Sequence, residues 1–297
     1  MAAGGVTVTH GPDGDRGPVW TAATGPVHPG LAGVARGYTG YTERHAGPLR
    51  RREPATGQVT LIVSFGDPLD IVEMSESSSG GRRLTSFVVG LHDGYAVTEH
   101  AGVQAGIQVD LTPLGAAAVL GIPPTALANE CVPLDDVLGR AAGELADRLA
   151  SAPAWADRFA LLDRLLLERT ADAPPPDPAV AWAWDQLARS GGQVPVGLLA
   201  EEIGWSRRHF GARFRAEVGL PPKPAARVLR FTAAARRLAA GTGGSIADVA
   251  AAGGYADHSH LVREFRRLAG CTPSQLAAEE VAFVQAGEGG APVPSGA

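Results

Sequence analysis

The sequence has no apolar stretch long enough to cross a membrane and only two cysteines. None of its uninterrupted apolar runs approaches the roughly 18 residues that a membrane-spanning helix needs. The first residues also lack a basic segment followed by an apolar core, so we expect no secretory signal there. Cys131 and Cys271 lie far apart in the sequence, which fits neither a disulfide framework nor a zinc-ligand spacing. We therefore predict a cytoplasmic protein that has no membrane partner.

Acidic residues outnumber basic ones, but the two signs are unevenly distributed. The formal net charge is −5, which is unusual for a protein that binds nucleic acid. Residues 1–178 carry a net charge of −8, whereas residues 179–285 carry +4. Because the local charge decides whether a surface attracts phosphates, the second part of the chain is the candidate nucleic-acid-binding region.

A proline-rich segment separates the acidic and basic parts. In ADAPPPDPAV, Ala171 to Val180, three consecutive prolines cannot continue a helix and favour a stiff extended spacer. A chain of 297 residues is long enough for two domains. We expect a flexible tail over residues 1–17, a first domain over 18–170, a linker over 171–178, a second domain over 179–285 and a flexible tail over 286–297.

The first domain is predicted to be rich in β-strands and to end in a helix pair. Segments 58–65, 83–90 and 106–113 are rich in β-branched residues or alternate apolar with polar ones. Leucines then recur at helical spacing over about 134–169, with one short connection that favours antiparallel neighbours. We predict a sandwich or barrel followed by two helices. The leucine stripe forms internal packing, a dimer seam or both, and we favour the dimer seam.

The second domain contains an internal repeat. LAEEIGWSRRHFGARFRAEVGLPP, Leu199 to Pro222, aligns with VAAAGGYADHSHLVREFRRLAGCTP, Val249 to Pro273, with one residue inserted in the second turn. Each copy has a short helix, a glycine turn with an aromatic residue, a capping residue and a longer helix that ends at a glycine. This order predicts two helix–turn–helix motifs, and segment 222–241 between them has the apolar spacing of a linker helix.

The longer helix of the second copy, about 258–269, has an apolar face and a polar face. At about 100° per residue, Leu261, Phe265 and Leu268 fall in one stripe, with the polar residues roughly opposite. The N-terminal part of such a helix reaches base edges in the major groove, where arginine, serine and histidine can bond bases. Basic residues one turn further suit phosphates. The candidate DNA-binding residues of this copy are Asp257, His258, Ser259, His260, Arg263, Arg266 and Arg267.

The corresponding helix of the first copy, about 207–218, has fewer groups that can bond a base. Gly211 and Ala212 occupy its outer face, so we expect more phosphate contacts and fewer base contacts there. A linker helix of about 16 residues could hold the two longer helices roughly one DNA turn apart, about 34 Å. The candidate DNA-binding residues of this copy are Ser206, Arg207, Arg208 and Arg215.

Two such motifs joined by a helix and ending in GGYADHSHLVREFRRLAGCTPSQL resemble the AraC/XylS family of bacterial transcription regulators. The resemblance covers about residues 180–280. It implies an α+β chain in which an N-terminal β-rich, cupin-like sandwich or barrel with a helix pair precedes an all-α domain of two helix–turn–helix motifs. It also implies an activator or repressor that binds double-stranded DNA and acts with RNA polymerase. The first domain is then expected to sense a small-molecule effector, to form a homodimer, or both.

A different class of function stays open for the first domain. An enzyme or a metal-binding cupin-like domain could use His92, His100 or Cys131. A metal cupin, however, usually has an HxH pair with a later Glu and His, and that pattern is absent. We expect the two histidines in surface loops, Cys131 as a small buried residue and the arginines of RRR at 50–52 in a solvated loop. No catalytic residue, metal or cofactor is predicted.

Overall fold

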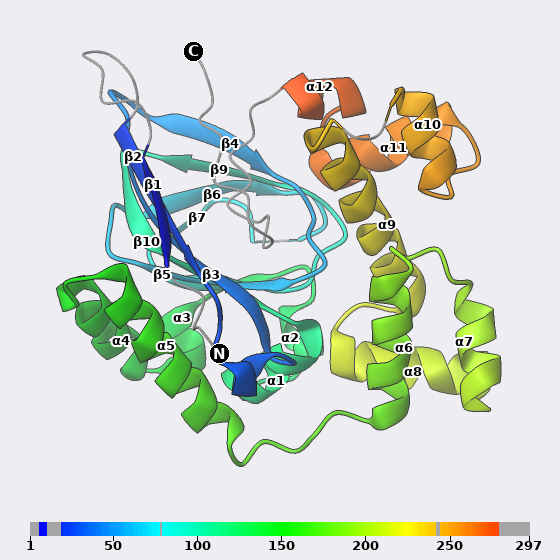
Figure 1. Cartoon of the computed structure of the whole chain (residues 1–297), viewed down its shortest axis with the longest axis horizontal. Helices are drawn as coiled ribbons and strands as arrows, with labels where there is room; N and C mark the ends of the chain where they lie inside the picture. The colour runs from blue at the N-terminus through cyan, green and yellow to red at the C-terminus, as the bar shows by residue number, and fades with distance from the viewer. Residues whose placement is uncertain (1–5, 11–18, 78, 242–243, 279–297) are drawn as a thin grey trace.

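A β-rich N-terminal half and a helical C-terminal half lie side by side in the protein. The structure is a computed structural model that describes residues 6–10, 19–77, 79–241 and 244–278. Figure 1 shows the two layers of strands next to a group of helices, with the chain crossing between them after α5 (Trp155–Thr170). Within the described ranges, no helix combines the length and the apolar character that a membrane span requires.

Two antiparallel sheets form a sandwich in the N-terminal half, as the sequence predicts. The smaller sheet has the order β4 (Leu49–Glu53), β9 (Ala96–His100), β6 (Leu69–Met74) and β7 (Arg82–Leu84). The larger sheet has the order β1 (Thr7–His10), β2 (Val19–Gly25), β3 (Ala35–Arg44), β10 (Val103–Leu111), β5 (Val59–Ser64), β8 (Phe87–Val89) and β11 (Cys131–Pro133).

Two details of the predicted strands were wrong. Segment 83–90 is two short strands in different sheets, because the chain breaks at Thr85 and Ser86 between β7 and β8. Residues 7–10, expected in a loose tail, pair with β2 as β1 in a register that sets Thr7 opposite Thr24. Alternating valine and threonine suit this edge strand. The other residues of the two predicted tails, 1–5, 11–17 and 286–297, lie outside the described residues.

The helices of the N-terminal half cover one side of the larger sheet (Figure 1). The first predicted helix of the pair is broken, because Gly139 has a positive φ of 59° that ends one helix before the next begins. Leu134, Leu149 and Leu162 have no exposed surface, so the leucine stripe packs inside the chain. Besides α5, these helices are the 3₁₀ turn Pro29–Leu31, α1 (Pro113–Leu120), α2 (Pro124–Leu127), α3 (Leu134–Leu138) and α4 (Ala141–Ser151).

The helical half contains two helix–turn–helix motifs on either side of a long helix. Its helices are α6 (Pro178–Arg189), α7 (Val196–Ile203), α8 (Arg207–Val218), α9 (Pro222–Ala239), α10 (Ile246–Ala252), α11 (His258–Ala269) and α12 (Pro273–Ala278). The motifs are α7–α8 and α10–α11, so the predicted longer helices at 207–218 and 258–269 are confirmed. The linker helix α9 has 18 residues, about one half-turn more than expected.

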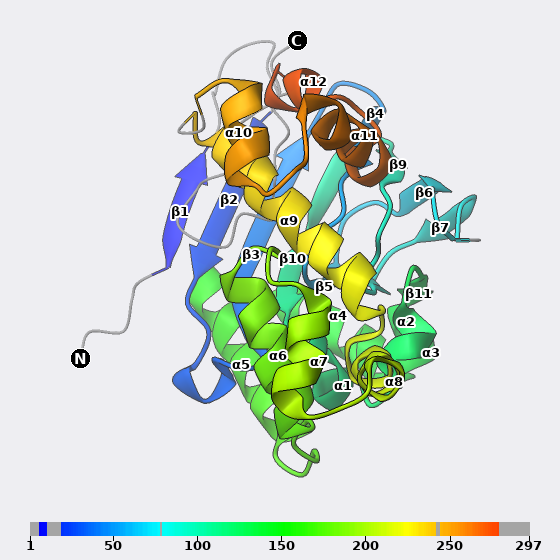
Figure 2. The ribbon, with the colours of Figure 1, turned by 90° about the vertical axis from the view of Figure 1, so that its right-hand side faces the viewer.

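The two halves share one continuous apolar core. Buried residues of the larger sheet, of α1, α2 and α4 to α6, and of both helix–turn–helix motifs belong to a single cluster. Figure 2 shows α9 passing in front of the sandwich, with α8 near one of its ends and α11 near the other. The halves are therefore packed together, and the linker over residues 171–177 does not hold them apart.

Candidate DNA-binding surface and interior pocket

Helix α11 is fixed by an apolar face and a polar cap. Leu261, Phe265 and Leu268 are fully buried, and the Phe265 ring packs edge-on against Phe231 of α9, with ring centres 4.8 Å apart. The Asp257 carboxylate accepts a hydrogen bond of 2.7 Å from the backbone N–H of His260, which starts the helix at His258. These contacts fix which face of α11 points outward.

The outward face of α11 carries most of the predicted DNA-binding residues. His260 is only half exposed, because its ring lies edge-on to Tyr255, with ring centres 5.3 Å apart, and its Nδ1 accepts from the backbone N–H of Ala256. The other predicted residues of this motif are exposed: Asp257, His258, Ser259, Arg263, Arg266 and Arg267. Three cationic side chains therefore share one accessible face with the hydroxyl and imidazole groups of the first helical turn.

Helix α8 presents a second exposed basic face. The Ser206 hydroxyl accepts from the backbone N–H of His209 at 3.2 Å, and Phe210, Phe214 and Val218 are buried. The predicted residues of this motif are all exposed: Ser206, Arg207, Arg208 and Arg215. Arg207 lies 3.6 Å from the Glu201 carboxylate, but both side chains are exposed and such a pair contributes little. The basic face of α8 is therefore accessible to an anionic partner.

Asp93, in the turn between β8 and β9, contacts two arginines of the helical half. Its backbone N–H donates to Asn129 at 2.9 Å, and the Asn129 amide donates back to its carboxylate at 3.1 Å. The other carboxylate oxygen accepts from Arg227 of α9 at 2.5 Å and from Arg267 of α11 at 3.4 Å. Arg267 also lies 3.3 Å from Glu76. We call these five residues the Asp93 cluster.

Further contacts tie both longer helices to the N-terminal half. The backbone N–H of Ala55 donates to the carbonyl of Leu268 at 2.8 Å, near the end of α11. At the end of α8, Gly219 packs so closely on α2 that a side-chain carbon there would lie 2.9 Å from the carbonyl oxygen of Pro124. The N-terminal half thus holds one end of each longer helix.

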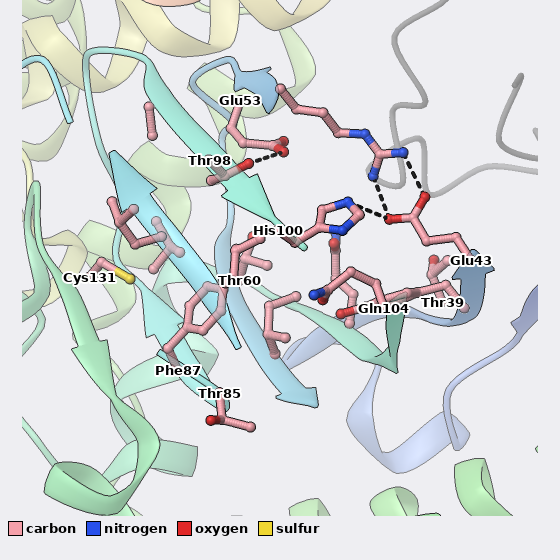
Figure 3. A pocket seen from close by; sticks show the side chains of 18 of the residues that line it. Thr39, Glu43, Glu53, Thr60, Thr85, Phe87, Thr98, His100, Gln104 and Cys131 are labelled. Atoms are coloured by element: carbon pink, nitrogen blue, oxygen red, sulfur yellow. Dashed lines mark hydrogen bonds and ion pairs between the residues drawn. The ribbon is translucent and has the colours of Figure 1, made fainter. Parts of the chain in front are cut away.

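A cavity of about 170 Å³ lies between the two sheets. Its walls come from β2, β3, β5, β8, β10 and β11 of the larger sheet and from β4, β6 and β9 of the smaller one. Figure 3 shows Phe87 and Cys131 on one side of this pocket and Glu43, His100 and Gln104 on the other. The pocket is thus apolar at one end and polar at the other.

The polar end is organised around the Glu43 carboxylate. Arg51 donates two hydrogen bonds to it, at 2.7 and 2.6 Å, while His45 and His100 place ring nitrogens 3.2 and 3.3 Å away. Burial alone would raise the pKa of Glu43, but the contacts from His100, Arg51 and His45 outweigh it and hold that pKa far below its usual range. The carboxylate stays ionised and compensates the Arg51 charge.

A second carboxyl, Glu53, lies beside this group. The Thr98 hydroxyl donates to it at 3.3 Å (Figure 3). Burial raises the pKa of Glu53, and the Arg51 charge and the Thr98 hydrogen bond offset that effect only in part. Burial similarly raises the pKa of Tyr41, together with the charges of Glu43 and Glu53. The environment therefore favours neutral Glu53 next to a compensated ion pair.

The residues considered for catalysis or metal binding lie inside the sandwich. His92 and His100 are buried, so their predicted place in surface loops was wrong, and both line the pocket. Burial lowers the pKa of His92 despite a contact of 3.1 Å between its Nδ1 and the Gly90 carbonyl. Cys131 is buried, as predicted, and burial raises the pKa of its thiol to about 12. Within the described residues, no group of three or more His, Cys, Asp and Glu side chains is placed to hold a metal ion.

Sequence reasoning missed the polar end of the pocket. The run RRR at 50–52, expected in a solvated loop, belongs to strand β4, and Arg51 reaches inward to Glu43. Alternation along a strand was the available signal, because Arg51 and Glu53 are two residues apart and therefore share one face. By the same rule, the neighbouring residues Glu99 and His100 of β9 face opposite sides, and of the two His100 lines the pocket.

The family model that matches the chain lies in the helical half. Residues 199–279 match a family model described as a helix-turn-helix domain, a range that covers both motifs, from α7 to α12. Together with the paired motifs, this match shows a helix–turn–helix domain of the AraC type in the C-terminal part of the chain. No curated protein sequence matches the chain.

Several solved structures are similar to the chain at low sequence identity. ToxT from Vibrio cholerae has 10% identity and a TM-score of 0.46, with 78% of this chain and 96% of ToxT covered. The C-terminal domain of AraT, a response regulator from Geobacillus stearothermophilus, has 20% identity and a TM-score of 0.33, with 35% and 88% covered. The xylose-binding transcription activator xylR has 22% identity and a TM-score of 0.31, with 41% and 37% covered.

Proposed function

Because residues 199–279 form a helix–turn–helix domain of the AraC type, we propose that the protein is a sequence-specific DNA-binding transcription regulator. The observation that carries the proposal is the pair of exposed basic faces on α8 and α11, mounted at opposite ends of α9. An 18-residue helix is about 27 Å long. That length suits two helices that enter successive major grooves on one side of the duplex.

The two faces have different roles in this proposal. On α11, His258, Ser259 and Arg263 read base edges, because they occupy the first two turns of the helix. Arg266 and Arg267, one turn further, contact phosphates. On α8, Arg207, Arg208 and Arg215 act mainly on phosphates, with Ser206 capping the helix, since the outer positions 211 and 212 are glycine and alanine.

The N-terminal half senses a small-molecule effector and transmits its presence to α11. The pocket and the helical half contact the same two segments of the chain. Pro54 and His92 line the pocket, while their neighbours Ala55 and Asp93 hold α11 through Leu268 and Arg267. An effector acts through this route only if it binds the two arrangements of the halves with different affinity.

The protein is proposed to work in the cytoplasm, without catalytic chemistry, and to act on RNA polymerase. The raised pKa of Cys131 argues against a nucleophilic thiol. His92 and His100 have contacts that fit a structural role in the pocket wall. A homodimer would use a surface other than the leucine stripe, which packs inside the chain.

Selection of bound sequences from random duplex DNA by the full-length protein tests the proposal. We expect an enriched site with two recognised blocks about one helical turn apart, and one block more strictly defined than the other. The stricter block belongs to α11. Binding without enrichment, which disappears as salt rises, would reduce the basic faces to a nonspecific electrostatic patch and overturn the proposal.

A further inference from the structure

We propose that the cavity between the two sheets binds a small uncharged molecule with an apolar body and a hydrogen-bonding head group. This inference rests on the proposed function, because it names the chemical class of the effector.

The size of the cavity limits the ligand to about one ring. Its volume is about 170 Å³. A cavity of roughly 150 Å³ lined by aliphatic and aromatic side chains is large enough to take up benzene. A molecule with one ring or a short branched chain therefore fits between the sheets without moving them.

The apolar end of the cavity accommodates the body of such a molecule. Ile62, Ile71, Met74 and Phe87 form a buried cluster with Cys131 and line the cavity. The thiol is neutral, since burial raises its pKa to about 12. These side chains offer dispersion contacts and no charge, so they favour an apolar ligand surface.

The polar end does not offer a free cation to an anionic head. The Arg51 guanidinium already donates two short hydrogen bonds to Glu43, and His45 and His100 contact the same carboxylate. A buried carboxylate head would lose its hydration and meet the ionised Glu43 carboxylate as a like charge. An anion is therefore disfavoured.

A cationic head is disfavoured by the Arg51 charge. Glu53 is the one carboxyl of the described lining residues without a cation in hydrogen-bond contact, but the Arg51 charge reaches it and burial favours its neutral form. An ammonium ion would have to ionise Glu53 and to bear the repulsion of Arg51. A neutral hydroxyl or amide avoids both costs.

Two of the buried polar atoms without a hydrogen-bond partner among the described lining residues mark where a neutral head would bind. His100 is 3% exposed and its Nδ1 has no hydrogen-bond partner among the described residues. The indole N–H of Trp20, which also lines the cavity, is buried and likewise unpartnered within the described part of the chain. Buried polar groups are normally paired, so a head group that both donates and accepts would complete the site.

Three probes with one ring and different head charges test this inference: benzyl alcohol, benzoate and benzylammonium. Each is added to the full-length protein while the melting temperature and the tryptophan indole signals in ¹H–¹⁵N spectra are followed. Trp20→Phe identifies the Trp20 signal. We expect benzyl alcohol to raise the melting temperature in a saturable way and to shift the Trp20 signal, with weaker effects of both charged probes.

A cavity-filling variant and a matched control separate binding in the pocket from binding elsewhere. Ala96→Leu adds apolar volume to a residue that lines the cavity, whereas Ala160→Leu makes the same change on the exposed side of α5. We expect Ala96→Leu to weaken the affinity for benzyl alcohol at least about tenfold, which corresponds to about 1.4 kcal/mol of binding free energy. Ala160→Leu should leave this affinity unchanged. Binding of the selected DNA by both variants confirms that they fold.

Each remaining outcome overturns a defined part of the scheme. Stronger binding of benzoate or benzylammonium than of benzyl alcohol would overturn the uncharged head group. Absence of binding by all three probes, in protein that still selects a DNA site, would overturn the pocket as the ligand site. Failure to select any DNA site would instead count against the proposed function.

Discussion

Asp110, at the end of β10, is a buried acid of the sandwich that feels the charge of Arg236 on α9. It is 3% exposed, and the Gln108 amide donates to it at 2.7 Å. Burial raises the pKa of Asp110 to about 6, although the Gln108 hydrogen bond and the charge of Arg236 on α9 both act to lower it. The ionised form is therefore less stable in the folded protein than in the unfolded chain.

Replacing this acid is expected to change how stability depends on pH. Because the folded pKa lies above the unfolded value of about 3.9, the folded state binds more protons between about pH 4 and pH 6. The free energy of unfolding should therefore fall as pH rises through that window. Asp110→Asn should remove the contribution of this residue to the slope and stabilise the protein at pH 7.5 by about 3 kcal/mol. Urea unfolding at pH 4.5 and 7.5 measures both effects.

The exposed acid Asp70 provides the control for Asp110. Asp70→Asn changes the net charge equally but lies on the exposed side of β6, so its effect on stability should stay within about 0.5 kcal/mol. A wild-type protein that becomes more stable between pH 4.5 and 6, or an Asp110→Asn variant no more stable than wild type at pH 7.5, would contradict the prediction.

Residue identity alone did not reveal which polar residues of the sandwich are buried. A run of three arginines is usually solvated, yet Arg51 lies against Glu43, because β4 pairs with β9 and turns one side of the strand inward. His100 is buried for the same reason. The sequence shows the alternation within each strand, but the sheet to which a strand belongs depends on pairings with residues far along the chain.

At the scale of one element, the proposed function assigns the arginines of α11 to two kinds of DNA contact. Arg263 lies in the second turn, where base edges are within reach, and Arg266 lies nearly one turn further. Arg263→Ala should cost about 1–3 kcal/mol and relax the preference at one base position. Arg266→Ala should weaken binding to all sequences alike. It should also reduce the slope of the logarithm of the binding constant against the logarithm of the salt concentration by about one.

Affinities for the selected site, and for every single-base change in it, distinguish these two arginines. The measurements are made at several salt concentrations, and each variant serves as the control for the other. Both side chains are exposed, so neither truncation should disturb the packing of α11. An equal loss on every sequence for Arg263→Ala would remove its assignment to a base.

Elements with strong end signals were predictable, and elements without them were not. Helices α8 and α11 have capping residues at Ser206 and Asp257 and terminal glycines, and an internal repeat supports both. Helix α1 is apolar on all sides, with leucine, valine and alanine, so the sequence gives no face to recognise. The first helix of the predicted pair is interrupted at Gly139, because a glycine inside a helical pattern is compatible with either a continued helix or a break.

At the scale of the whole molecule, the uneven distribution of charge also holds the two halves together. Asp93 and Glu76 of the sandwich form ion pairs with Arg227 and Arg267 of the helical half. Composition predicts that the halves attract each other. It does not predict which carboxylates meet which arginines, because the docking depends on the shapes of two folded surfaces.

If Arg267 contacts DNA as proposed, the Asp93 cluster competes with DNA for its side chain. Asp93→Asn keeps the size of the side chain and an acceptor for Asn129, but it removes the charge that holds Arg227 and Arg267. If DNA binding requires α11 to leave the sandwich, this variant should bind the selected site on the order of 5–30-fold more tightly, equivalent to about 1–2 kcal/mol.

Asp70→Asn controls for the change in net charge, because Asp70 lies on the same half and pairs only with Arg83, at 3.9 Å, among the described residues. The two variants and the wild type are compared by titration at 150 mM salt, where long-range charge effects are screened within about 8 Å. Equal affinities for the two variants would mean that the Asp93 cluster does not restrain α11, and that an effector must act on DNA binding through another contact between the halves.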